Sequence, residues 1–165
     1  MKTILFLCAY NASRTIMAEA ILNHLGAGRM RAFSAGDRAI GEVHPLTLRT
    51  LAAHGIPTDG LRSKSWEQFF GLGAPHIDFV ITVCDEHHED GGNRDRSQPV
   101  KAHWPTLYPL AGTRSETEAV EALERTYVLL HERIQALLAL PLDSMSREAA
   151  RAALAAIGQQ AAPAG

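Results

Sequence analysis

The residue types best suited to chemistry lie together near the start of the chain. Cys8 and Arg14 are separated by five residues. These five residues are Ala9, Tyr10, Asn11, Ala12 and Ser13. The apolar run Ile4-Leu5-Phe6-Leu7 before them predicts a buried strand, and helical spacing of apolar residues after them predicts a helix over Thr15–Leu25. The segment therefore reads as a loop that joins a strand to a helix.

A loop in this position can bind an oxyanion. Its backbone N–H groups can turn into a common concavity, and the following helix adds the positive end of its dipole. These groups and Arg14 favour the thiolate of Cys8, so we expect its pKa to lie below the free value of about 8.5. Arg14 offers a planar fork for two oxygens, and the hydroxyl of Thr15 can donate to the sulfur. Asn11 is expected to tolerate positive φ within the loop.

The same residues also have a purely structural interpretation. Cys8 can be a buried cysteine at the end of a strand, and Arg14 a solvated residue at the start of a helix. Cys84 follows another buried strand and is either a second, resolving thiol near Cys8 or a small buried hydrophobe.

Other polar clusters are weaker signals. The run from His87 to Asp90, with His103 downstream, lacks a regular ligand spacing, so we expect a solvated loop and no metal site. The Gly- and Asn-rich run 90–97 is predicted to be a mobile flap. Trp66 and Trp104 are expected to pack in the core.

Strands that alternate with helices must position these residues. Further strands are predicted at 31–35, 77–83 and 100–104, and further helices start at Pro45, at a cap on Ser63, and at Glu116. The helix from Glu116 carries apolar residues at 120, 123, 127, 130, 134 and 137. This alternation is typical of a parallel α/β sheet.

We expect one main domain over residues 1–140. Residues 141–165 are predicted to form an alanine-rich helix, capped by Asp143 or Ser144, and a flexible tail from Gly158.

Composition excludes several classes of protein. The 165 residues carry a formal net charge of −2, so nothing points to nucleic acid or to an anionic membrane. No apolar run approaches the roughly 20 residues of a membrane span, and the short apolar start lacks a signal-peptide cleavage pattern. Two cysteines are too few for a disulfide scaffold, which favours a cytoplasmic protein with reduced thiols.

The segment from Phe6 to Glu19 resembles the phosphate loop of the low-molecular-weight protein tyrosine phosphatase superfamily. Further landmarks are similar to those of its arsenate reductase branch, and the resemblance covers roughly Met1 to Leu138. They are Ser34-Ala35-Gly36, His44-Pro45, Gly55-Ile56-Pro57, Ser63-Lys64-Ser65, the run from Asp78 to Asp85, and Ala102-His103-Trp104. The resemblance implies a three-layer α/β sandwich of the phosphotyrosine phosphatase I-like type, with a four-stranded parallel sheet and helices on both faces. It also implies that Cys8 attacks arsenate and that a second thiol then releases arsenite.

Three positions depart from the family pattern. Tyr10 stands where a small residue is usual, so its ring can alter access to the loop. Members that use thioredoxin have a further cysteine about seven residues beyond the position of Cys84, where this chain has Asp90-Gly91-Gly92. Tyr108, before Pro109, stands where the superfamily places its general acid aspartate.

These departures shape the functional prediction. Without a third cysteine, an external thiol such as glutathione or mycothiol is expected to complete the reduction, with a glutaredoxin-like or thioredoxin-like partner and no bound cofactor. Loss of the general acid aspartate is expected to slow the hydrolysis of a phosphoester roughly a hundredfold or more. Arsenate needs to lose only water or hydroxide, so Tyr108, or Asp85 as a substitute, can serve as the acid.

The sequence therefore predicts a thiol-dependent arsenate reductase that acts in arsenic detoxification. Two alternatives stay open, which are a low-molecular-weight protein tyrosine phosphatase and a non-catalytic oxyanion-binding protein.

Overall fold

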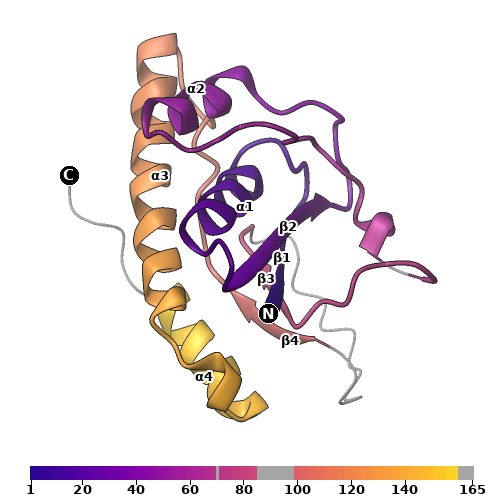
Figure 1. Cartoon of the computed structure of the whole chain (residues 1–165). Coiled ribbons are helices and arrows are strands. Elements are labelled where there is room, and N and C mark those ends of the chain that lie inside the picture. Colours follow the sequence, from indigo (N-terminus) through magenta and orange to yellow (C-terminus); the bar gives the residue numbers. More distant parts are fainter. Residues whose placement is uncertain (70, 85–98, 160–165) are drawn as a thin grey trace.

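The computed structural model describes residues 1–69, 71–84 and 99–159. Strands and helices alternate over most of the chain (Figure 1). In order, the elements are β1 (Lys2–Cys8), α1 (Arg14–Leu25), β2 (Met30–Gly36), α2 (Pro45–Ala53), the 3-10 helix η1 (Trp66–Phe69), β3 (Phe79–Thr82), β4 (Val100–His103), α3 (Glu116–Leu138), the 3-10 helix η2 (Leu142–Ser144) and α4 (Arg147–Gly158). The alternation confirms the predicted α/β class.

The four strands form one parallel sheet in the order β2-β1-β3-β4. The chain therefore moves from β1 to one neighbour, β2, and then crosses to the other neighbour, β3. In such sheets, ligands bind beyond the carboxyl ends of the strands at the point where the order reverses. Here that point lies between β1 and β3, where Leu7 pairs with Thr82. Cys8 and Cys84 follow these two residues closely, so the topology brings both thiols to one place.

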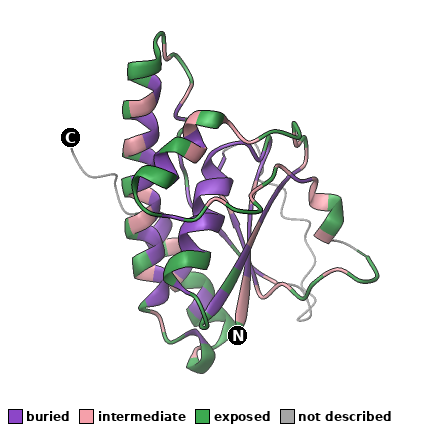
Figure 2. Cartoon of the chain, turned by 45° about the horizontal axis from the view of Figure 1, so that its top comes forward, coloured by how far each residue is buried: buried purple, intermediate pink, exposed green. Residues whose placement is uncertain are grey.

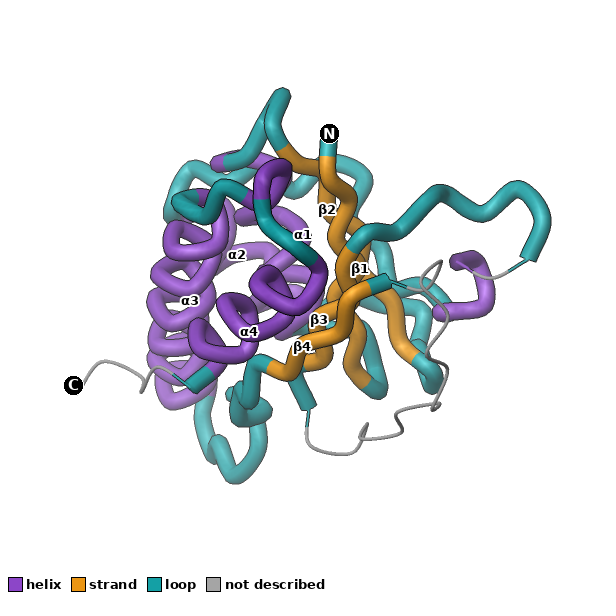
Figure 3. Tube along the Cα trace, turned by 90° about the horizontal axis from the view of Figure 1, so that it is seen from below, coloured by secondary structure: helices purple, strands orange, loops and turns teal. Residues whose placement is uncertain are grey.

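The two faces of the sheet are covered differently. Alternate residues of β1, such as Ile4 and Phe6, belong to the larger core cluster, which includes apolar residues of α1, α3 and α4. Leu5 belongs to a smaller cluster on the other face, against which Trp66 and Phe69 of η1 pack. Figures 2 and 3 show the buried strands and α1, with the four α-helices together on one side of the sheet and η1 on the other. Helical segments thus lie on both faces, but the second face is covered by a single 3-10 turn among the described residues.

The long helix α3 follows the predicted pattern. Its N-cap is Ser115, whose side chain accepts a hydrogen bond from the N–H of Glu118. The positions predicted from the apolar period are buried or half-buried, and Leu123, Leu130 and Ile134 are fully buried. One charged residue, Arg133, is buried on the same face, at 3% exposure.

Two predicted helix starts were wrong. The cap of α4 is Ser146, which accepts from the N–H of Ala149, whereas Asp143 and Ser144 belong to η2. The predicted helix from Ser63 is the shorter 3-10 turn η1. Ser63 donates instead to the carbonyl of Tyr10, and the hydroxyl of Ser65 accepts from the N–H of Glu67.

Helix α4 packs against the domain that carries the other elements. Leu154 and Ile157 are part of the larger core cluster, and the indole Nε1 of Trp104 donates to the carbonyl of Leu154 at 2.9 Å. Figure 3 shows α4 beside β4. Trp104 is fully buried. No helix among the described residues is long and apolar enough to cross a membrane.

Candidate oxyanion site

The loop between β1 and α1 is held by its carbonyl groups. The carbonyls of Ala9, Tyr10 and Ala12 accept hydrogen bonds from a single following segment. The donors are the backbone N–H groups of Arg38 (2.9 Å), Ile40 (3.3 Å) and His44 (3.0 Å). In a planar trans peptide, the N–H group points opposite to the carbonyl. The N–H groups of these same peptides therefore turn away from the 38–44 segment and toward the inside of the loop.

Close packing from β2 supports this geometry. A Cβ atom built on Gly36 would lie 2.4 Å from the carbonyl oxygen of Ala9, so a side chain at this position would push the loop out of place. Gly36 also donates its N–H to the carbonyl of Lys64 at 2.9 Å. The Ser34-Ala35-Gly36 landmark thus has a physical role, because only glycine lets the two segments approach.

Asn11 fixes the shape of the loop. Its φ of 49° is the one positive value outside glycine among the described residues, as predicted for this position. The side chain is fully buried and donates to the hydroxyl of Thr15 at 2.8 Å, while its Oδ1 accepts from the N–H of Lys64 at 2.8 Å. Two hydrogen bonds therefore compensate for the cost of the left-handed conformation.

Cys8 lies at the base of the loop with 3% exposure. A hydrogen bond from the Cys84 thiol is the largest of the effects that lower the pKa of Cys8 to about 5. The backbone N–H of Asn11, the charge of Arg14 and the hydroxyl of Thr15, 3.8 Å from the sulfur, act in the same direction, while burial opposes them. The predicted low pKa has thus a main cause that the sequence did not identify, which is the second cysteine.

Arg14, at the start of α1, is buried to 7% exposure. Its Nη1 donates to the carbonyl of Thr106 at 2.8 Å, and its guanidinium carbon lies 5.3 Å from the centre of the Tyr108 ring. The structure therefore brings Tyr108 to Arg14, as its assignment to the site requires. Tyr108 is 40% exposed.

The start of α1 is left open. Ser13 is the N-cap residue, but its side chain makes no capping hydrogen bond. Its hydroxyl pairs instead with that of Thr47 in α2 at 2.8 Å. The hydroxyl of Ser13 therefore does not occupy the first N–H groups of α1, which is the arrangement that an oxyanion at this end of the helix needs.

A buried ion pair supports the loop from behind. The ammonium of Lys64 lies 3.6 Å from a carboxylate oxygen of Glu19, and both side chains are nearly inaccessible. Ser34 donates to Glu19 at 3.0 Å, and Lys64 donates to the carbonyl of Arg62 at 2.8 Å. Burial raises the pKa of Glu19 and lowers that of Lys64, and each charge partly offsets the shift of the other.

The rim of the site carries Tyr10. Its ring is 41% exposed, and the guanidinium carbon of Arg38 lies 5.5 Å from its centre. His103, which follows the histidine-rich run in the sequence, pairs its Nδ1 with the hydroxyl of Thr82 at 2.7 Å. The alternative acid Asp85, the run from His87 to Asp90, the predicted flap and most of the predicted tail lie outside the described residues.

Four residues support the site in ways that were not predicted from the sequence. They are Glu19, Lys64, Thr106 and Arg133. A charged residue inside an apolar helical stripe was a usable signal for Arg133, because it lies between Leu130 and Ile134 on the buried face of α3. Lys64 and Thr106 gave no such signal, since their roles depend on contacts across the fold.

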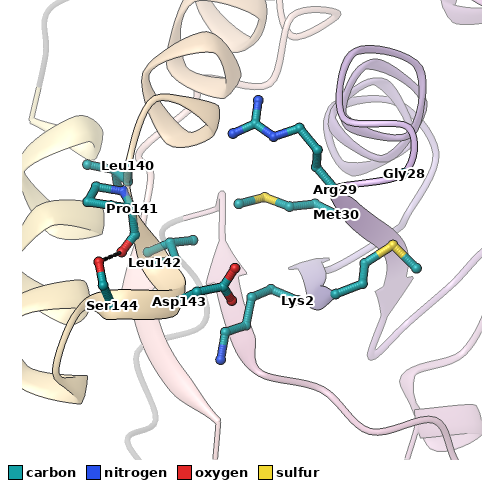
Figure 4. A pocket seen from close by; sticks show the side chains of 10 residues that line it. Lys2, Gly28, Arg29, Met30, Leu140, Pro141, Leu142, Asp143 and Ser144 are labelled. Carbon is teal, nitrogen blue, oxygen red and sulfur yellow. Dashed lines mark hydrogen bonds between the residues drawn. The ribbon is translucent and has the colours of Figure 1, made fainter.

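A cleft of about 610 Å³ lies far from the loop, at the amino-terminal end of the sheet between the start of β1 and η2 (Figure 4). Lys2, Arg29 and Asp143 are its charged residues. Cys8 is at the opposite, carboxyl end of β1, so this cleft is not part of the site.

A family model described as low molecular weight phosphotyrosine protein phosphatase matches residues 3–148. The chain belongs to this family. The family match covers the loop, both cysteines and Tyr108, and it ends in the first turn of α4. The predicted family resemblance is thereby confirmed.

Solved structures of family arsenate reductases are similar to the chain. "An arsenate reductase in the phosphate binding state" is 27% identical, with a TM-score of 0.64, over 84% of this chain and 98% of the other. The arsenate reductase from Archaeoglobus fulgidus is 26% identical, with a TM-score of 0.62, over 83% and 99%. The low molecular weight phosphatase from T. tengcongensis, at 22% identity and a TM-score of 0.65 over 84% and 98%, shows the shared fold.

A curated relative adds sequence similarity. The glutaredoxin arsenate reductase of Synechocystis sp. is 34% identical over 84 residues. The aligned residues make up 51% of this chain and 61% of that protein. The match therefore spans less than two thirds of the relative.

Proposed function

We propose that the chain is an arsenate reductase that obtains its electrons from an external thiol. One observation carries the proposal, which is that Cys8 and Cys84 lie together just beyond the paired ends of β1 and β3, at the base of an oxyanion loop. A phosphatase needs a single nucleophilic thiol. Reduction of arsenate also needs a second thiol that attacks the sulfur of the first, and Cys84 is placed for this step. The similarity to arsenate reductases supports the same reaction.

Arsenate binding is assigned to the loop and to Arg14. The loop of residues 9–14 surrounds the oxygens of the bound anion, with the inward N–H groups of Tyr10, Asn11 and Ser13 and the guanidinium of Arg14 as donors. The low pKa of Cys8 keeps its sulfur in the thiolate form at neutral pH. Thr15 donates to the thiolate and so holds its position.

In the first step, the Cys8 thiolate attacks arsenic. An S–As bond forms and an As–O bond breaks, and the leaving oxygen takes up a proton to depart as water. Tyr108 is the proposed donor of that proton, since its ring lies beside Arg14. Because water is an easier leaving group than an alkoxide, a weak acid is sufficient.

In the second step, Cys84 loses its proton to solvent and attacks the sulfur of Cys8. The S–S bond forms and the S–As bond breaks, and its electron pair stays on arsenic, which departs as arsenite. Two molecules of a low-molecular-weight thiol of the glutathione or mycothiol type then reduce the Cys8–Cys84 disulfide, directly or through a glutaredoxin-like or thioredoxin-like protein.

Arsenite formation tests the proposal. Arsenate is supplied with glutathione and glutaredoxin, with mycothiol and mycoredoxin, or with thioredoxin, each with its own reductase. We expect turnover in at least one thiol system, none with Cys8→Ser, and at least a tenfold slower release of arsenite with Cys84→Ser. A Cys84→Ser variant as fast as the parent would show that the external thiol attacks Cys8 directly. A Cys8→Ser variant as fast as the parent would overturn the proposal.

Aryl phosphate hydrolysis separates this function from that of a phosphatase. The family and the loop favour phosphatase activity, but Tyr108 stands in place of the acid that expels an alkoxide or phenoxide. Turnover of an aryl phosphate that matches or exceeds arsenate reduction would select the phosphatase. Anion binding with no turnover of either substrate would select a non-catalytic binder.

A further inference from the structure

The guanidinium of Arg14 is held from the loop that follows β4. Its Nη1 donates to the carbonyl of Thr106, which fixes one edge of the planar group. Thr106 is itself buried and donates its N–H to the carbonyl of Val83, and its hydroxyl donates to the carbonyl of Trp104. The direction in which Arg14 presents its remaining N–H groups therefore depends on the position of Thr106.

A second guanidinium holds Thr106 from the other side. Arg133 of α3 donates from Nη1 to the Thr106 hydroxyl at 3.1 Å and to the carbonyl of Pro105 at 3.0 Å. Arg133 is only 3% exposed, and burial lowers its pKa. A cation buried at this cost is expected to have a specific role. Here Arg133 donates to Thr106, the residue whose carbonyl accepts from Arg14.

The end of α4 completes the arrangement. Nη2 of Arg133 donates to the carbonyl of Gly158 at 3.4 Å. A Cβ atom on Gly158 would lie 2.3 Å from the carbonyl oxygen of His103 and 2.8 Å from the Trp104 ring, so the last turn of α4 fits closely against the end of β4. Helix α4 packs against β4, and Figure 1 shows α4 beside the lower end of α3. Residues 149–158 lie outside the family match, so this support comes from a part of the chain that the family model does not include.

We propose that Arg133, locked by the last turn of α4, is a positioning residue that orients Arg14 for oxyanion binding through Thr106. The inference rests on the proposed function only for the role of Arg14 in binding an oxyanion. It assigns to α4 a role in the site even though α4 contributes no group that touches the anion.

Protection of Cys8 from alkylation measures this role without turnover. Inorganic phosphate is the probe, and its half-protecting concentration against iodoacetamide gives the affinity of the loop for an oxyanion. We expect Arg133→Met to raise the half-protecting concentration of phosphate roughly tenfold, because a misplaced Arg14 guanidinium loses a charge-assisted bidentate contact with the anion. The matched control is Arg125→Met, which removes an exposed guanidinium from the same helix. It is expected to leave the half-protecting concentration unchanged.

A double-mutant cycle distinguishes positioning from general destabilisation. If Arg133 acts through Arg14, then Arg133→Met has no further effect on phosphate protection in an Arg14→Met background. Equal losses in both backgrounds, or no loss in the parent background, would overturn the inference. The alkylation midpoint without phosphate stays close to that of the parent, because the Cys84 contact is the main cause of the low pKa.

Two further variants keep the inference testable if Arg133→Met does not fold. Thr106→Val removes the hydroxyl that Arg133 contacts and keeps the carbonyl that Arg14 contacts. Gly158→Ala pushes the last turn of α4 away from His103, with exposed Gln159→Ala as its control. Each of the two test variants is expected to raise the half-protecting concentration of phosphate several-fold. Parent-like protection in both would overturn the inference.

The readout also separates the inference from the proposed function. Phosphate protection that responds to Arg133, in a chain that forms no arsenite, would reject the arsenate reductase and retain the positioning role. Failure of phosphate to protect the parent would reject the positioning role.

Discussion

The thiol of Cys84 donates a hydrogen bond to the sulfur of Cys8, across the junction between β3 and β1. The contact follows from the sheet order, since β1 and β3 are neighbours and both residues follow the paired ends of their strands. It gives Cys84 two effects that variants can separate. As a donor it stabilises the Cys8 thiolate, and as a thiol it is the proposed resolving nucleophile.

The pKa of Cys8 is expected to depend on the hydrogen-bond donor at position 84. Cys84→Ala removes the largest of the contributions that lower it from the usual range to about 5. The pH midpoint of iodoacetamide alkylation should then rise by roughly one to two units. Cys84→Ser keeps a donor and serves as the matched control, with a smaller rise. Equal midpoints in the parent and Cys84→Ala would contradict the assigned cause.

The stability of the fold should depend on pH through Cys8. Its folded pKa of about 5 lies below the unfolded value, so the thiolate stabilises the fold fully above the unfolded pKa, and this contribution is lost as the pH falls toward the folded pKa. The gap in unfolding free energy between the parent and Cys8→Ser should therefore widen by up to about 1.4 kcal/mol per pH unit from pH ~5 to ~8.5. Urea unfolding under reducing conditions at several pH values measures it. A gap that stays constant with pH would rule out this linkage.

Loss of Lys64 should leave Glu19 buried without its cation. We expect Lys64→Met to lower the free energy of unfolding by about 3–5 kcal/mol, and the double variant Glu19→Gln/Lys64→Met to recover most of it. The charge of Lys64 lowers the pKa of Glu19 against the effect of burial, so this pKa rises further when Lys64 is removed. The loss in Lys64→Met is therefore larger at neutral pH than below the unfolded pKa of about 4.3, where Glu19 is protonated in both proteins. Urea unfolding at several pH values measures both effects.

The control for this prediction is Lys101→Met, which removes the same charge from an exposed position in β4. It should change stability by less than about 0.5 kcal/mol. A double variant less stable than Lys64→Met alone would contradict the coupling of the two residues.

Tyr108 is expected to set the choice of reaction. Tyr108→Phe keeps the ring beside Arg14 and removes the hydroxyl, so arsenate reduction should slow several-fold. Tyr108→Asp supplies the acid that the family phosphatases use, and aryl phosphate hydrolysis should increase by roughly 10- to 100-fold. The ratio of the two initial rates is the measurement. If this ratio is unchanged in Tyr108→Asp, residue 108 does not take part in the proton transfer.

The parts of the site that follow the chain locally were predictable from the sequence. The strand before Cys8, the helix after Arg14 and the positive φ of Asn11 depend on apolar runs, helical spacing and the conformational range of asparagine, and all three are confirmed. The parallel α/β class followed from the alternation of strands and helices in the same way.

The parts that depend on contacts across the fold were not predictable. Which polar residue caps α4 depends on where η2 ends, which shifted the start from the predicted Asp143 or Ser144 to Ser146. Likewise, the contact of Arg133 with Thr106 joins residues 27 positions apart, and nothing local in either segment indicates the other. The helical period of α3 indicates that Arg133 faces the core, but it does not reveal which partners the guanidinium meets there.

The anchoring of the loop carbonyls by Arg38, Ile40 and His44 has a consequence for how anions enter and leave. A receptor whose dipoles are already oriented has little reorganisation to undergo on capture, so the association rate is expected to be set by diffusion and by the charge of the incoming species. The same rigid loop is expected to bind the substrate of the proposed reaction more strongly than its product. Arsenate arrives as an anion that matches the fixed field, whereas arsenite is neutral at physiological pH and is poorly retained, so the proposed product should leave without any opening of the loop.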